Sequence, residues 1–273
     1  MRVLSILVTA TAAAGCAGPS GPYPTGFGYG LPSPPEATYL IGDTVVATAN
    51  LPVGELVTTG GYSLELDLTF APDSGGVRVR GIAQSFDGSL AAPGDVNLTT
   101  DLSYLSETLD FVTNRHGVAS VESFPQLAGA PSHVFFPARL PHDLFPRLPD
   151  SVVDPGSTWV DTVRWHSDGW EVEGDSRAVY TYTLVGDTVV DGHSLVHIAV
   201  EGEVRLSIFT GGPGNLTVRA VKGPAAGFLQ WDPRRGLVAY RQYEMDLTGH
   251  WARPRRDPFP MSVRRKVRLR LIG

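Results

Sequence analysis

One stretch of the sequence alternates strictly between apolar and polar residues, and this pattern restricts the fold more than any other feature. From Tyr62 to Phe70 every second residue is apolar and each residue between is polar. Successive side chains of a β-strand point to opposite faces, so the stretch predicts a strand with one buried and one solvated face. Residues 195–208 and 237–248 repeat the alternation, although Arg241 interrupts the apolar side of the second stretch. Such half-buried strands are typical of antiparallel sheets.

Shorter β-patterns follow one another along the chain and are separated by turn signals such as 72–76 and 232–236. Two of these patterns, 216–222 and 228–231, are expected to form separate strands. The chain holds 31 glycines and 22 prolines, spread along its length, which favours turns over long helices. No long amphipathic helix is evident beyond the N-terminus. We therefore expect an all-β, mainly antiparallel fold, built as a strongly curved sheet or half-barrel.

The N-terminus carries an export signal. An apolar run, 3–14, ends just before Cys16, the only cysteine of the chain. The run is too short to span a bilayer but fits the core of a signal peptide. Small residues directly before the cysteine resemble the lipobox of bacterial lipoproteins, which implies a signal peptide over 1–15 and acylation of Cys16. Because Ala17 rather than aspartate follows, this resemblance implies the outer membrane. The alternative is an ordinary secretory signal that ends near Ala14.

The remainder of the chain divides by composition. Residues 16–38 are rich in glycine and proline and are expected to form a tether. A β-rich domain is expected over 39–273, with two halves, 39–124 and 156–273, joined by 125–155. The joining segment has seven prolines in 31 residues, which exclude a long helix. Because it is also strongly apolar, we expect it to lie as a strap over the sheet.

Two short motifs occur twice in the chain, which raises the question whether its two halves arose by duplication. The sequence Gly-Asp-Thr-Val-Val occurs at 42–46 and again at 186–190. A second pair of similar turns, within 111–118 and 230–237, has a different spacing. Either the halves are related by duplication, or β-hairpins reuse the same turn residues.

The chemistry-bearing residues predict no catalytic or metal site. His193 and His197 are four residues apart in a predicted strand, or roughly 13 Å, too far to share a zinc ion whose ligands lie at about 2 Å. The acidic stretch 161–175 lacks the ligand spacing of a calcium loop. No nucleophile elbow or phosphate-binding loop is present. With 22 basic and 28 acidic residues, the chain is not expected to bind nucleic acid. We expect a protein that is not an enzyme and has no cofactor.

The C-terminal segment is basic. From residue 251 to the end there are eight basic residues and one acidic residue. In the last predicted strand, basic residues gather on one face and apolar residues on the other. This face is a candidate surface for anionic lipid headgroups, and its residues are Arg264, Lys266, Arg268 and Arg270. The alternative is a solvated strand face that pairs with acidic neighbours.

Three short motifs, at 155–159, 182–187 and 228–238, together with the lipobox, resemble a group of envelope lipoproteins from high-GC bacteria. The Trp-Asp-Pro turn in 228–238 is similar to that of LolA/LppX-like half-barrel lipoproteins. The resemblance covers roughly 39–273. It implies a curved antiparallel sheet that wraps an apolar cavity and carries or senses lipid.

We therefore predict a lipid-anchored envelope protein that carries or senses an apolar or lipid ligand. Its pocket is expected to be lined by alternating strand residues. These residues are Leu64, Leu66, Leu68, Phe70, Tyr243, Met245 and Leu247. The alternative is a structural or accessory lipoprotein that binds another envelope protein through a sheet edge or through the basic C-terminal face.

Overall fold

A computed structural model describes residues 27–94, 96–127, 135–169, 172–210 and 217–273. The fold is almost entirely β-structure, with one short 3₁₀ turn, η1, at Leu102–Tyr104 and a second, η2, at Pro137–Arg139, followed by the single-turn helix α1, Leu140–Leu144. The strands are β1 Glu36–Leu51, β2 Gly54–Asp73, β3 Gly76–Ala92, β4 Val96–Asp101, β5 Leu105–Ser106, β6 Leu109–Thr113, β7 Ala119–Ser123, β8 Gln126–Leu127, β9 Thr158–Gly169, β10 Val172–Val190, β11 His193–Thr210, β12 Thr217–Asp232, β13 Leu237–Ala252 and β14 Phe259–Leu271.

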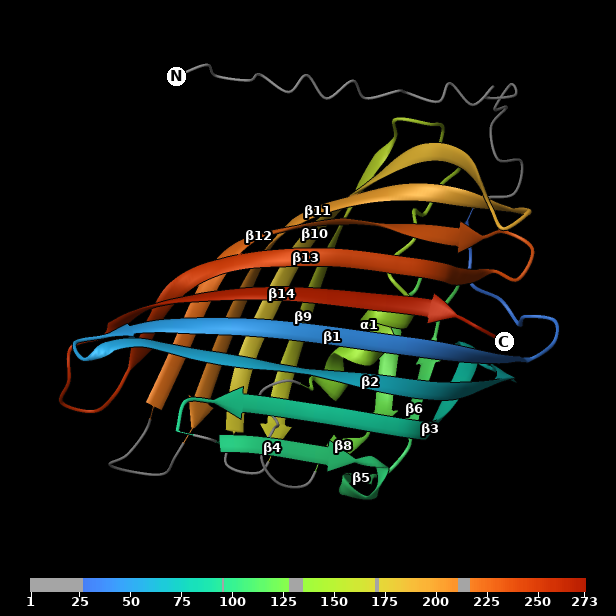
Figure 1. The fold of residues 1–273 in the computed structure, drawn as a ribbon. Helices are drawn as coiled ribbons and strands as arrows, with labels where there is room; N and C mark the ends of the chain where they lie inside the picture. The colour runs from blue at the N-terminus through green and yellow to red at the C-terminus, as the bar shows by residue number, and fades with distance from the viewer. Residues whose placement is uncertain (1–26, 95, 128–134, 170–171, 211–216) are drawn as a thin grey trace, which may run out of the picture.

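One large antiparallel sheet organises the chain (Figure 1). Its strand order is β7-β6-β3-β2-β1-β14-β13-β12-β11-β10-β9, and β4 pairs with the part of β3 that β6 leaves free. The chain therefore starts in the middle of the sheet, runs outward to β7, crosses to the opposite edge at β9, and returns strand by strand to the middle. The first and last long strands, β1 and β14, pair there along eleven residue pairs from Tyr39↔Leu271 to Ala49↔Met261. The sheet is strongly curved and open, which confirms the predicted all-β half-barrel.

The predicted alternation is present in the long strands. In β2 the even-numbered residues from Leu64 to Phe70 are buried, while their odd-numbered neighbours are not. The prediction of two strands within 216–232 is wrong, because β12 runs through Gly223 and Pro224 without ending. Pro224 lacks an amide hydrogen, and the β12–β13 register contains no partner for either residue. The turn-forming residues thus interrupt the pairing with β13 while the backbone stays extended.

Glycines on β12 allow its close approach to β13. A Cβ built on Gly227 would overlap with the carbonyl oxygen of Gln242, and one built on Gly223 would overlap with that of Asp246. Glycine within a strand commonly marks a tight bend of a sheet or a close approach of two backbones. The absence of side chains here therefore permits part of the curvature that turns the sheet into a half-barrel.

The proline-rich strap lies in the concave face of the sheet (Figure 1). Its part from 135 to 148 begins η2 at Pro137 and places Pro141 in the first turn of α1, where a missing amide hydrogen is tolerated. Its apolar side chains are buried among the strands; they are Phe135, Phe136, Leu140, Leu144, Phe145 and Leu148. The strap is also the connection between the two free edges, so the core is formed by the sheet closing around it.

The packed domain begins before residue 39. Phe27 and Tyr29 are buried, and Tyr29 packs at 4.9 Å from Phe145 and 5.0 Å from Trp231, measured between ring centroids. The Tyr29 hydroxyl donates a hydrogen bond to the carbonyl of Pro146 at 2.9 Å. The expected tether, 16–38, is therefore too long at its C-terminal end, because aromatic residues between its glycines fill the core. Of the helices in the described part of the chain, none has the length and apolarity needed to cross a membrane.

Candidate functional site: an apolar cavity and its charged neighbours

The concave face holds an apolar cavity of ≈ 260 Å³ at the end of the sheet where β1 turns into β2, on the left in Figure 1. Its walls are the ends of strands from both halves, because the pairing of β1 with β14 brings those strands together. Most of the lining is aliphatic, as in Val45 and Ala47 of β1 and Leu206 and Ile208 of β11. Phe136 of the strap also lines the cavity. The cavity can accept an apolar group.

Two arginines are the charged residues of the cavity wall. Arg265 of β14 is buried and forms a salt bridge with Asp43 of β1, to which its Nε donates at 2.8 Å. Its guanidinium carbon also lies 4.5 Å from the centroid of the Phe136 ring. Arg265 is thus already held by a carboxylate and an aromatic face of the protein itself.

Arg219 of β12, the second arginine, lies at the end of the cavity. Its guanidinium carbon is 5.5 Å from the ring centroid of Trp251 on the adjacent strand β13. A further cation, Arg253, lies 4.0 Å from the same ring. Burial and the neighbouring Arg253 lower the pKa of the Arg219 guanidinium. Among the described residues neither Arg219 nor Arg253 forms a salt bridge.

A second buried charge network fixes the strap to the sheet. Asp143 of α1 lies 3.3 Å from Nε of Arg139 and accepts a hydrogen bond from the Tyr243 hydroxyl at 3.1 Å. Arg241 of β13 donates to the carbonyls of His142 at 2.8 Å and Asp143 at 3.2 Å. Burial raises the pKa of the Tyr243 phenol, so this group remains a donor. The network links α1 to β13.

The seven residues expected to line a pocket lie elsewhere. Leu64, Leu66, Leu68 and Phe70 of β2 are all at most 7% exposed, and Tyr243, Met245 and Leu247 of β13 are at most 1% exposed. None of the seven lines the cavity. They form the core beneath the strap, because the strap occupies the part of the concave face that these residues line. Cys16, the expected lipid-anchor residue, lies outside the described residues.

The basic face of β14 is largely paired with β13. Arg264 contacts Asp246 at 3.0 Å, Lys266 forms a salt bridge with Glu244, and Nε of Arg268 donates to Gln242 at 3.2 Å. Arg270 is exposed and forms no salt bridge within the described part of the chain. The arrangement matches the alternative of a solvated strand face whose charges pair with their neighbours, and it leaves Arg270 as the member still available to an anion.

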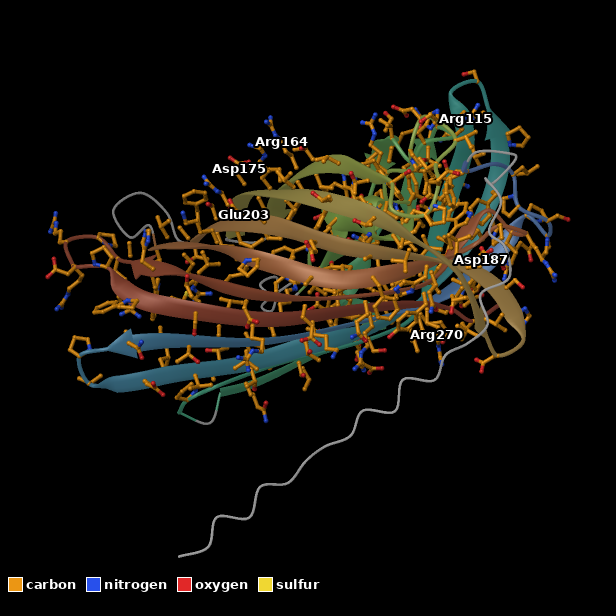
Figure 2. All side chains as sticks on the ribbon, turned by 90° about the horizontal axis from the view of Figure 1, so that it is seen from above. Arg115, Arg164, Asp175, Asp187, Glu203 and Arg270 are labelled. Carbon is orange, nitrogen blue, oxygen red and sulfur yellow. The ribbon has the colours of Figure 1, made fainter. Side chains whose placement is uncertain are left out.

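A row of four cations crosses the outer face of the same half of the sheet, nearer to the edge strand β9. Arg164, Arg177, Arg205 and Lys222 are directly opposite one another on β9, β10, β11 and β12. All four are exposed, and a shallow hollow of ≈ 460 Å³ lies at the three arginines. Figure 2 shows Arg164 with Asp175 and Glu203 on this side of the sheet. Within the described residues only Arg205 has a salt bridge, at 3.4 Å to Glu203.

The sequence contained signals for some of these positions. Arg241 interrupts an apolar strand face, which indicated a buried cation, and Arg265 likewise falls on the apolar side of the last strand. Their partners on α1 and β1 depend on the topology and have no local signal. The row of four cations could not be predicted from the sequence, because it depends on the register of four strands. Across the described ranges, no group of three or more His, Cys, Asp or Glu side chains could hold a metal ion.

No protein-family model and no curated protein matches the chain. Among solved structures, the chain is similar to the outer membrane protein OpdK from Pseudomonas aeruginosa, with 6% identity and a TM-score of 0.20. That comparison covers 87% of this chain and 99% of the OpdK chain. A TM-score this low is below that of chains that share a fold.

Proposed function

We propose that this protein is a lipid-anchored envelope protein that binds an apolar or lipid ligand in the cavity between β1, β11 and β14. The observation that carries this proposal is the cavity itself, ≈ 260 Å³ and lined mainly by aliphatic side chains. Small-molecule pockets are concave, mostly apolar and of about 300 Å³ upward. Apolar cavities of only about 150 Å³ already take up benzene. An apolar group therefore has room and a favourable surface here.

The N-terminal sequence supports the location. A signal peptide over 1–15, acylation at Cys16 and the following Ala17 are consistent with an anchor in the outer membrane. Residue 27 enters the fold beside Trp231, at the end of β12 opposite the cavity. β1 has 16 residues, which at roughly 3.3 Å per residue span about 50 Å. The point where the described chain enters the fold and the cavity therefore lie at opposite ends of the sheet. We include in this proposal the resemblance of the Trp-Asp-Pro turn in 228–238 to LolA/LppX-like half-barrel lipoproteins.

The row of cations favours a second candidate, an accessory lipoprotein that binds another envelope protein. Like charges directly opposite each other destabilise a sheet, so an acidic partner surface would relieve the repulsion between Arg164, Arg177 and Arg205. This candidate uses the outer face and leaves the cavity without a role. The basic face of β14 supports it less, because its charges already pair with β13.

The test is native mass spectrometry of the mature chain with Cys16→Ser, exported to a bacterial periplasm and purified without detergent. We expect a discrete added mass that dissociates as a lipid or other apolar compound. Ala47→Phe places a ring in the cavity wall and is expected to abolish the added mass. Ala226→Phe, on the exposed face of β12, is the matched control and is expected to keep it. A bare polypeptide mass that persists after mixing with membrane lipid extract overturns the proposal.

A further inference from the structure

The end of the cavity contains a cation in an otherwise apolar row. Ile208, Arg219, Trp251 and Phe259 are directly opposite one another on β11, β12, β13 and β14. Arg219 and Trp251 line the cavity. A charged side chain among apolar neighbours at the wall of a binding cavity is unfavourable unless it interacts with a charge or a π-system.

The Trp251 ring is the aromatic contact of both nearby cations. It lies 5.5 Å from the guanidinium carbon of Arg219 and 4.0 Å from that of Arg253. One cation–π contact is a modest stabilisation, and two guanidinium groups beside one indole repel each other. In the part of the chain that the structure describes, no carboxylate is within salt-bridge distance of either group.

A third hydrogen-bond donor at this place also lacks an acceptor. The indole Nε1 of Trp251 is buried, and no acceptor for it lies among the described residues. Buried polar groups are normally satisfied. The cavity end therefore combines two guanidinium groups and an indole donor, all of which would be satisfied by oxygen atoms that carry negative charge. Arg265 is different, because Asp43 already supplies its carboxylate.

We propose that the ligand is an anionic amphiphile whose carboxylate or phosphate headgroup binds Arg219 and Arg253 beside Trp251, while its apolar tail occupies the cavity. This inference rests on the proposed function, because the tail uses the same cavity. Arginine suits the headgroup, since its guanidinium binds carboxylate and phosphate oxygens in a bidentate manner. A charge-assisted hydrogen bond contributes about 1.5–3 kcal/mol. The headgroup should therefore improve affinity by about tenfold or more.

The experiment compares ligands that have the same tail and different heads. Isothermal titration calorimetry of the mature Cys16→Ser chain would use decanoate, decanol and decyltrimethylammonium, all below their micellar concentrations, with inorganic phosphate as a fourth titrant. We expect decanoate to bind at least about tenfold more tightly than decanol, the cationic amphiphile to bind more weakly than decanol, and phosphate alone to bind weakly.

Variants locate the headgroup. Arg219→Gln is expected to remove the preference for decanoate over decanol while decanol binding is retained. Arg253→Gln changes an exposed side chain and is expected to reduce the preference without affecting folding. Arg255→Gln is the matched control, because Arg255 lies in the same β13–β14 turn but, among the described residues, the cations in contact with the Trp251 ring are Arg219 and Arg253; it should leave the preference intact.

The outcomes separate the two proposals. If decanoate and decanol bind equally, or if Arg219→Gln and Arg253→Gln keep the preference, the headgroup inference is wrong and the apolar cavity stands. If no amphiphile binds, the proposed function fails with it. If phosphate alone binds as tightly as decanoate and depends on Arg219, the site takes a free anion and the amphiphile is excluded.

Discussion

Asp43 and Arg265 are 222 residues apart in the sequence, yet their side chains form a buried salt bridge in the middle of the sheet. Arg265 Nε lies 3.0 Å and 2.8 Å from the two carboxylate oxygens, and its Nη2 donates to one of them as well. Asp43 is on β1 and Arg265 on β14, so the pair joins the first and last long strands. Both side chains are almost fully buried.

Asp43→Asn removes the carboxylate that faces the buried Arg265 guanidinium. We expect the free energy of unfolding to fall by about 3–5 kcal/mol, as is typical when one member of a buried ion pair is lost. Urea denaturation at constant pH measures the change. The double variant Asp43→Leu with Arg265→Met removes both charges and should be more stable than Asp43→Asn. A loss below about 1 kcal/mol in Asp43→Asn would contradict the buried pairing.

Gly227→Ala places a Cβ between the closely spaced strands β12 and β13. The new methyl group would overlap with the carbonyl oxygen of Gln242, so the strands must separate. We expect destabilisation by about 3 kcal/mol, measured as a lower urea midpoint. Gly42→Ala is the matched control, because its Cβ would lie 4.0 Å from the nearest atom, the carbonyl oxygen of Tyr62. Equal stability of the two variants would refute the proposed steric origin.

Acidification should weaken the attachment of the strap through His142. Burial lowers the pKa of this histidine below its usual 6.5. The unfolded chain therefore binds a proton at higher pH than the folded chain, and the unfolded state gains stability as the pH falls through 6.5. We expect the free energy of unfolding to decrease in this range. His142→Gln should flatten that part of the pH profile, measured by urea denaturation. An unchanged slope in the variant would exclude this histidine as its source.

Arg177 lies between two other arginines in the row on the outer face. Arg177→Glu turns two repulsive cross-strand pairs into attractive ones, each worth roughly 0.2–1 kcal/mol. We expect stability to rise by about 1 kcal/mol at low ionic strength and the gain to shrink at about 1 M salt, where charges are screened. Arg177→Gln removes only the repulsion and should give a smaller gain. A gain that is independent of salt would point to a cause other than charge.

The strands that alternate cleanly could be predicted from the sequence, because alternation depends only on each strand having one buried face. Leu64 and Leu66 are buried as that pattern requires. Their role was mistaken, since a buried face does not reveal whether it meets a ligand or, as here, the strap. Arg241 could be recognised in the sequence because it interrupts an apolar strand face. Its hydrogen-bond acceptors on α1 could not be recognised there. Phe27 and Tyr29 were assigned to the tether because the glycines around them obscured two core aromatic residues.

The pairing of β1 with β14 is expected to form late in folding. Until the last strand is available, the side of β1 that faces away from β2 has no partner for its eleven pairing residues. Each half can form its own hairpins early, since neighbouring strands there are joined by short turns. The pairing of β1 with β14 instead joins strands that are more than 200 residues apart in the sequence. Pairing between strands so far apart is slow. Until then the edge of β1 is open to aggregation or to a chaperone, and pairing with β14 ends that exposure.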